Sequence, residues 1–143
     1  MTARAADLAM DWFQVTRDPA LSTQMQVVEQ VRQGVPWKDF VAAMDELGLT
    51  QKDAARLLHL PERTLARRRA GRLDPQEGER FLRLIRLWGL AYDVLGATDK
   101  AWRWLRGPNR ALGGVVPLSL LDTDIGTQVV EDILGRIEYG VFS

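Results

Sequence analysis

An all-α fold is predicted for this chain of 143 residues. Its apolar residues recur every three to four positions along most of the length, as they do on one face of a helix. No stretch shows the sustained apolar–polar alternation between turn signals that marks paired strands. With 46% hydrophobic residues, the chain is long enough to bury one core or two small ones.

Residues 1–20 hold one weak amphipathic segment, around Leu8, Trp12 and Val15, which Pro19 interrupts. Chain ends with so few apolar positions are often poorly ordered unless something ties them down. We expect residues 1–20 to form an N-terminal arm that is flexible or packs on a partner.

Two helices are predicted after this arm. The first covers residues 23–32 and stops at Gly34, and the second begins at Pro36 and ends at Gly48. Their apolar residues fall at helical spacing and are expected to face the core: Met25, Val28 and Val31 in the first helix, and Trp37, Phe40, Val41 and Met44 in the second.

Residues 50–72, TQKDAARLLHLPERTLARRRAGR, have the layout of a helix-turn-helix. A short first helix is broken at Leu60-Pro61, and a second helix follows with arginines on its outer faces. The residues expected to pack inward are Ala54, Ala55, Leu58 and Leu65. Such a second helix is suited to the major groove of DNA.

His59 stands at the turn position that most often holds glycine in such motifs. Histidine tolerates left-handed backbone geometry better than most residues. We interpret His59 as a turn residue, with contact to a DNA phosphate as the alternative and metal binding as a remote one.

Charge is unevenly distributed, although the whole chain is formally neutral. Residues 1–48 carry 4 basic and 7 acidic residues, residues 49–72 carry 7 and 2, and residues 73–143 carry 8 and 10. The net charges are therefore −3, +5 and −2. Because phosphate contact depends on local potential, the +5 segment is compatible with DNA binding by a neutral protein.

The DNA-binding candidates are polar residues of the helix-turn-helix. Arginine can bond bidentately to guanine, and residues near helix starts commonly contact the DNA backbone. We expect base or phosphate contacts from Arg63, Arg67 and Arg68, and phosphate contacts from Gln51, Thr64, Arg69 and Arg72. The alternative for the arginine run is a solvated helix face.

A long helix is predicted from Asp74-Pro75-Gln76-Glu77, which supplies an N-cap, a proline at the first position and an acid at the third, to Gly96. Short helices follow, and a last one covers residues 125–139 with Ile125, Val129, Ile133 and Ile137 on one face. Helical spacing places Trp37, Trp88 and Trp104 in the core but leaves Trp12 and Trp102 open.

Several classes of function lack the residues that they need. The chain has no cysteine and one histidine, so no thiolate metal site and no cofactor is expected. No nucleophile, base and orienting residue can be assembled, which argues against an enzyme. Asp122, Asp124, Glu131 and Asp132 are interpreted as helix-capping or solvent-facing residues rather than a catalytic or metal site.

The start of the sequence carries acidic residues where a signal peptide has an apolar core, and no apolar run approaches the roughly 18 residues that span a bilayer. We therefore expect a cytoplasmic protein that is not associated with a membrane. The chain's last residues include Phe142, which has no following sequence to cover it and is a candidate anchor for a partner.

One C-terminal pattern is specific: A-x-x-W-L from Ala101, P-N-x-x-L-x-G from Pro108, P-x-x-L-L-x-T from Pro117, and R-I-x-x-G from Arg136. It resembles the toxin-binding domain of the Xre/MbcA/ParS antitoxins. The preceding half resembles this family's Xre-type module at Thr50-Gln51, at Arg63-Thr64-Leu65 and from Glu79 to Arg83. The resemblance covers nearly the whole chain.

The resemblance implies an antitoxin of a type II toxin–antitoxin pair, whose toxin is an NAD-consuming RES-domain protein inhibited by direct contact. The antitoxin's last residues reach toward the toxin's active site, which makes Arg136, Tyr139, Gly140, Val141, Phe142 and Ser143 the toxin-binding candidates. The family binds DNA as dimers or within larger toxin–antitoxin complexes, which implies autoregulation of the operon.

The predicted organisation has three parts. Residues 1–20 form the arm, residues 21–96 an Xre-like helix-turn-helix module for DNA binding and dimerisation, and residues 97–143 a small helical toxin-binding domain packed with it. We expect a homodimer formed through the N-terminal helices. The alternative function is a stand-alone transcription regulator whose C-terminal domain senses a ligand or only dimerises.

Overall fold

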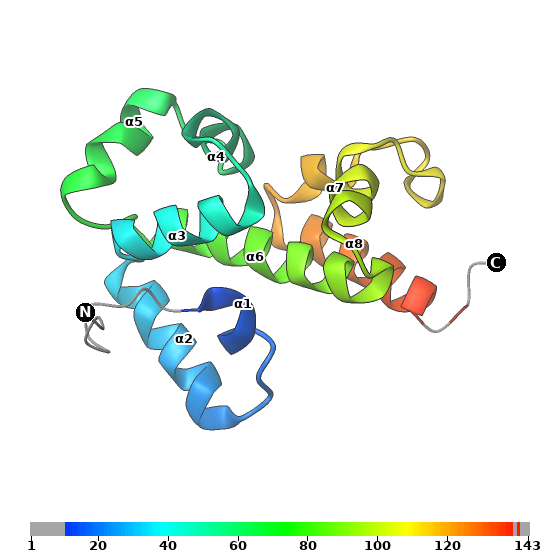
Figure 1. Cartoon of the computed structure of the whole chain (residues 1–143), viewed down its shortest axis with the longest axis horizontal. Helices are drawn as coiled ribbons and strands as arrows, with labels where there is room; N and C mark the ends of the chain where they lie inside the picture. The colour runs from blue at the N-terminus through cyan, green and yellow to red at the C-terminus, as the bar shows by residue number, and fades with distance from the viewer. Residues whose placement is uncertain (1–10, 139, 141–143) are drawn as a thin grey trace. The chain divides into compact units, whose positions relative to one another are not determined.

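The computed structural model describes residues 11–138 and 140 of the chain. Those residues form helices joined by turns, with two isolated β-bridges and no strand among them, which confirms the all-α prediction (Figure 1). Two compact units can be distinguished, Met1–Phe81 and Leu82–Ser143. The division predicted after residue 96 falls directly after a long helix, Pro75–Leu95, and stays a prediction.

The first unit contains α1 (Trp12–Val15), α2 (Leu21–Gln33), α3 (Trp37–Leu47), α4 (Gln51–Leu57), α5 (Glu62–Ala66), the 3₁₀ helix η2 (Arg67–Ala70) and the first turns of α6 (Pro75–Leu95). Its centre is aromatic. Phe81 lies edge-on to Trp12, with ring centroids 5.4 Å apart, and to Phe40, at 5.9 Å. All three are almost fully buried, so α1, α3 and α6 share one core.

Trp12 and Phe13 fall within the segment predicted as an arm, and both are buried in the first unit. The Trp12 indole Nε1 donates a hydrogen bond of 3.2 Å to the buried Asp39 carboxylate. Residues 1–10 lie outside the described part of the chain.

The expected inner face of α2 is wrong at two positions. Val27 and Val31 are buried, whereas Met25 and Val28 are exposed, as is Leu21 at the helix start. Residues 25, 28 and 31 drift around the helix by about 60° per step, since each residue advances about 100°. They therefore cannot share one narrow face. The buried residues are instead Val27 and Val31, which lie four positions apart.

The tryptophan predictions are partly confirmed. Trp88 is buried as expected, and so are Trp12 and Trp102, which the spacing left open. Trp37 and Trp104 are only half-buried. Trp37 is the first residue of α3, so its ring contacts Phe40 at a centroid distance of 5.1 Å but has no preceding turn over it.

The second unit contains the rest of α6, α7 (Thr98–Arg106), the 3₁₀ helices η3 (Arg110–Leu112) and η4 (Pro117–Leu120), and α8 (Asp124–Glu138). The α7 and α8 helices both pack against η4. Trp102 lies 6.2 Å from Trp88 and carries the Arg106 guanidinium 4.5 Å above its ring. This explains why Trp102, rather than Trp104, is buried in α7.

The start of α8 is held by Thr123, not by the neighbouring aspartates that were expected to cap it. The Thr123 hydroxyl accepts a hydrogen bond of 3.0 Å from the Gly126 backbone N–H. A Cβ at Gly126 would lie 2.2 Å from the Leu120 carbonyl oxygen. Only glycine therefore lets α8 approach η4 this closely.

The inner face of α8 also differs from the prediction. Val130, Ile133 and Leu134 are buried, whereas Ile125 and Val129 are exposed at 73% and 40%. The buried residues centre on Val130, and Ile125 and Val129 lie on a neighbouring side of the helix. Ile133 alone of the predicted stripe is buried, and Ile137 is half-buried.

Candidate functional site

The helix-turn-helix is built from α4, a tight turn and α5. The Thr50 side chain accepts from the Asp53 N–H while Asp53 accepts from the Thr50 N–H, a reciprocal capping box that fixes the start of α4. Ala54 and Ala55 from α4, Leu58 directly after it and Leu65 from α5 are buried, as the sequence predicted. Arg80 closes the other end of α4 by donating 3.0 Å to the Leu58 carbonyl.

His59 is confirmed as the turn residue. It has φ of 55° and is the one non-glycine residue with positive φ in the described part of the chain. The left-handed geometry reverses the chain directly after α4. Pro61, in an extended conformation, is then the N-cap residue of α5.

The second helix is shorter than expected. The α-helix ends at Ala66, and Arg67–Ala70 form a 3₁₀ turn rather than further α-helix. A 3₁₀ turn places residues three apart nearly in line. Arg67, Arg68 and Arg69 therefore point in three different directions around η2.

Arg68 faces the protein. Its Nε donates a hydrogen bond of 2.8 Å to Glu77 Oε1, and its Nη2 donates one of 2.9 Å to Glu77 Oε2. The pair is therefore bidentate, and the Glu77 side chain is 4% exposed. A second carboxylate, that of Asp74, lies 3.6 Å from Nη2. The hydrogen bonds and charge of Glu77 raise the pKa of Arg68 above its usual value.

Three other residues predicted to contact DNA also have partners within the first unit. Arg69 Nη2 donates 2.9 Å to Gln51 Oε1, which joins η2 to the start of α4. Arg72 Nη1 donates 3.1 Å to the Gly34 carbonyl, beside an isolated bridge between Arg72 and Pro36. Thr64 is half-buried on α5.

Arg63 and Arg67 are exposed, and neither makes a side-chain hydrogen bond or ion pair with the described residues. The same holds for Lys52 and Arg56 on α4, which sequence reasoning did not single out. The +5 charge of residues 49–72 was the signal that could have found them. These four cations of α4, α5 and η2 form a set that we call the free cations.

Of the predicted toxin-binding residues, Arg136 is exposed near the end of α8, and Gly140 follows the helix with φ of 72°. Arg136 has an interaction within the chain. Tyr139, Val141, Phe142 and Ser143 lie outside the described residues. Glu131, on the same helix, pairs with Arg86 of α6 at 3.1 Å.

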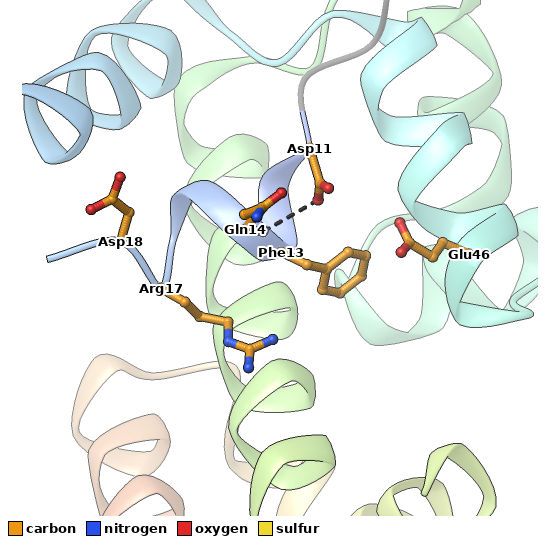
Figure 2. Close-up of a pocket in the computed structure, with 6 residues that line it drawn as sticks. All are labelled: Asp11, Phe13, Gln14, Arg17, Asp18 and Glu46. Atoms are coloured by element: carbon orange, nitrogen blue, oxygen red, sulfur yellow. Dashed lines mark hydrogen bonds between the residues drawn. The ribbon is translucent and has the colours of Figure 1, made fainter. Parts of the chain in front are cut away.

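A hollow of about 540 Å³ opens beside α1 in the first unit (Figure 2). Its lining includes no predicted site residue and consists of Asp11, Phe13, Gln14, Arg17, Asp18 and Glu46. Asp11 caps α1 by accepting 3.2 Å from the Gln14 N–H, as drawn in Figure 2. Asp18 accepts from the Ala20 N–H and the Thr23 hydroxyl, which lower the pKa of its carboxyl. The Asp11 and Asp18 carboxylates thus have local structural roles.

Among residues 11–138 and 140, no three or more histidine, aspartate or glutamate side chains lie together in a group that could hold a metal ion. None of the helices described is long and apolar enough to cross a membrane.

Two family models match the chain in succession. Residues 26–86 match the antitoxin Xre-like helix-turn-helix domain, and residues 90–140 match the antitoxin Xre/MbcA/ParS C-terminal toxin-binding domain. The first contains all the free cations, and the second ends at Gly140.

Curated relatives of the chain are also named as antitoxins. The chain is 40% identical over 98 residues to "Antitoxin Xre" of Yersinia enterocolitica, covering 66% of each chain, and 37% identical over 94 residues to that of Photorhabdus laumondii, covering 64% of each. It thus spans about two thirds of the length of these two relatives. It is also 35% identical over 124 residues to "Prs ADP-ribosylating antitoxin" of a Sphingobium species, covering 79% of this chain and 78% of that protein. The chain therefore belongs to the Xre family of antitoxins, a non-enzymatic class, with an Xre-like helix-turn-helix followed by an Xre/MbcA/ParS toxin-binding domain.

Proposed function

We propose that this protein is an antitoxin that neutralises a RES-domain, NAD-consuming toxin by binding it and occluding its active site in the cytoplasm. The observation that carries this proposal is the match of residues 90–140 to a toxin-binding domain. The name of the Sphingobium relative refers to ADP-ribosylation. ADP-ribosyl groups derive from NAD, so that name agrees with an NAD-consuming toxin.

The outer side of α8 supports direct binding. Ile125, Val129 and Arg136 lie at positions i, i+4 and i+11, which fall on one side of a helix. Ile125 and Val129 expose apolar surface at the start of this side, and Arg136 lies near its end. The predicted inhibitory residues 139–143 follow directly.

Toxin inhibition is tested with the co-encoded toxin and a chain shortened by Val141, Phe142 and Ser143. We expect the shortened chain to bind the toxin in a pull-down but to lose most of its inhibition of NAD consumption. A matched control replaces the same three residues by alanine, which keeps the chain length. Full inhibition by the shortened chain would refute occlusion by the terminus, and absence of toxin binding by the intact chain would refute the antitoxin proposal.

We also propose that the helix-turn-helix binds operator DNA and represses its own operon. The free cations support this, because Lys52, Arg56, Arg63 and Arg67 are exposed and form no ion pair with a described residue, in a segment whose net charge is +5. Gln51, Thr64, Arg69 and Arg72 stay candidates for contacts to the DNA backbone. If DNA binding holds and no toxin is bound, the protein is a stand-alone regulator.

A homodimer is proposed through α2. Leu21, Met25 and Val28 recur at four and three residues and expose 75%, 53% and 39% of their surface. An apolar stripe of this kind on a short helix is suited to pairing with its own copy. Two copies would present two helix-turn-helix motifs to half-sites about one turn of DNA, roughly 34 Å, apart.

A further inference from the structure

Arg68 has a contact that a DNA-reading residue would have to give up. Both guanidinium nitrogens that point toward Glu77 donate to it, at 2.8 and 2.9 Å, and the Glu77 side chain is nearly inaccessible to solvent. Charge-assisted bidentate pairs are among the strongest polar contacts in proteins. Arg67, one residue earlier, has no such contact with any residue that the structure describes.

Glu77 also caps the start of α6. Its Oε1 also accepts 2.8 Å from the Asp74 N–H, and the Asp74 carboxylate accepts 2.8 Å from the Glu77 N–H. This reciprocal capping box fixes the first turn of α6. Glu77 therefore joins the arginine turn η2 to a rigid helix start.

The turn η2 is fixed from two directions. Arg68 ties it to α6 through Glu77, and Arg69 ties it to α4 through Gln51 at 2.9 Å. The turn η2 is a 3₁₀ turn of four residues without a capping side chain at its N-terminus, and these two side-chain contacts add to its packing against α5 and α3.

We propose that Arg68 is a positioning residue rather than a DNA contact: its pair with the buried Glu77 holds η2 in place and thereby sets where Arg67 stands against the DNA. The inference rests on the proposed DNA binding. Arg68 is one of the residues that the sequence predicts to contact DNA, and Glu77 is predicted from the sequence only as a helix-capping acid.

Glu77→Gln separates the two roles because they predict opposite effects. Glutamine keeps the acceptor oxygen of a capping box but loses the charge that holds Arg68. If Arg68 positions η2, this variant binds the promoter duplex more weakly, on the order of ten-fold, which matches the loss of one charged hydrogen bond. If Arg68 contacts phosphate, releasing it from Glu77 leaves binding unchanged or tightens it.

Binding is measured by fluorescence anisotropy on the operon's promoter duplex over a series of salt concentrations. Positioning predicts that Arg68→Gln and Glu77→Gln lower affinity equally, that the double variant is no weaker than either, and that the slope of log K against log salt is unchanged. Removing a phosphate contact would instead reduce that slope by about 0.9. Arg67→Gln is the reference, with lower affinity and a reduced slope.

Arg68→Lys is the second test and does not alter the capping box. It keeps the charge but cannot pair bidentately. Positioning predicts that Arg68→Lys binds as weakly as Arg68→Gln, whereas near-normal binding would overturn the proposal. Val27→Ala controls for a general loss of stability, and we expect it to lower the melting temperature without changing affinity below the transition.

The outcomes separate this inference from the function on which it rests. If the unmodified chain does not bind the duplex, DNA binding and the role of Arg68 both fail. If the unmodified chain binds and Arg67→Gln weakens binding but Glu77→Gln does not, only the positioning role of Arg68 is overturned.

Discussion

Trp12 and Asp39 are joined by a hydrogen bond of 3.2 Å from the indole Nε1 to Oδ2, and the two residues are 1% and 4% exposed. A buried carboxylate that retains a donor is tolerated, whereas one that loses its donor is costly. The contact fixes α1 against α3 although the two lie 27 positions apart in sequence. It makes the residues just after position 10 part of the first unit's core.

Replacing Trp12 by alanine is therefore expected to destabilise the protein by about 3–5 kcal/mol, from reduced burial and the cavity left beside Phe81. Chemical denaturation followed by circular dichroism measures the change. Gln26→Ala, at an exposed position of α2 outside the Leu21, Met25 and Val28 stripe, is the control and should change stability by less than about 0.5 kcal/mol. Equal stability of Trp12→Ala and the unmodified chain would show that α1 does not belong to this core.

Arg63→Ala combined with Arg67→Ala should weaken promoter binding and reduce the salt slope by about 0.9 for each phosphate that is no longer neutralised. The reason is that both side chains are exposed and make no ion pair with the described residues. The control is the double change Arg103→Ala and Arg110→Ala, which removes the same charge from the second unit. Fluorescence anisotropy titrations at several salt concentrations measure the slope for each double variant. Identical slopes for the two would show that Arg63 and Arg67 do not contact the DNA phosphates.

Gly126→Ala should destabilise the second unit, because the new Cβ would meet the Leu120 carbonyl oxygen at 2.2 Å and the Thr123 hydroxyl at 2.8 Å. We expect a lower melting temperature and weaker toxin binding. Gly135→Ala, on the same helix with open space at its Cβ, is the matched control and should be neutral or slightly stabilising. A wild-type melting temperature for Gly126→Ala would contradict the close approach of α8 to η4.

Asp18 should make stability depend on pH at the acidic end. Hydrogen bonds from the Ala20 N–H and the Thr23 hydroxyl lower the pKa of its carboxyl below the ordinary value of 3.8. Because the pKa of Asp18 is lowered in the folded state, its contribution to the free energy of unfolding is complete above about pH 4. That contribution is lost as the pH falls through the pKa of Asp18 in the folded protein. Unfolding measured over an acidic to neutral pH series should show a smaller acid loss for Asp18→Asn than for the unmodified chain, and parallel curves would exclude this role.

Met25→Asp on α2 should shift the protein from dimer to monomer, because a charge in the middle of the Leu21, Met25 and Val28 stripe is costly to bury. Light scattering after size exclusion measures the mass. Ser22→Asp, at an exposed position between two stripe residues in sequence, is the control. If the unmodified chain is already a monomer at micromolar concentration, dimerisation through α2 is excluded.

The sequence was sufficient for features governed by local rules. The reciprocal cap of Asp74 and Glu77, the turn at His59 and the end of α6 at Gly96 all follow from residues within a few positions of one another. The all-α class follows from periodicity in the same way. Each of these predictions is confirmed.

Features that depend on tertiary contacts could not be predicted. The pairing of Arg68 with Glu77 requires η2 to lie beside α6, and the turn to 3₁₀ geometry after Ala66 accompanies it. The inner faces of α2 and α8 were misplaced because apolar residues outnumber the positions that the core can take. The DNA and toxin contacts stay predictions, since they depend on partners.

The division between the two units falls between Phe81 and Leu82, consecutive residues in the middle of α6. No loop marks this point, and a cut after Gly96 would strip the second unit of Leu84, Ile85 and Leu87, all fully buried. A fragment that begins after Gly96 would therefore lack three core residues of the second unit, whereas a fragment that begins at Leu82 keeps them.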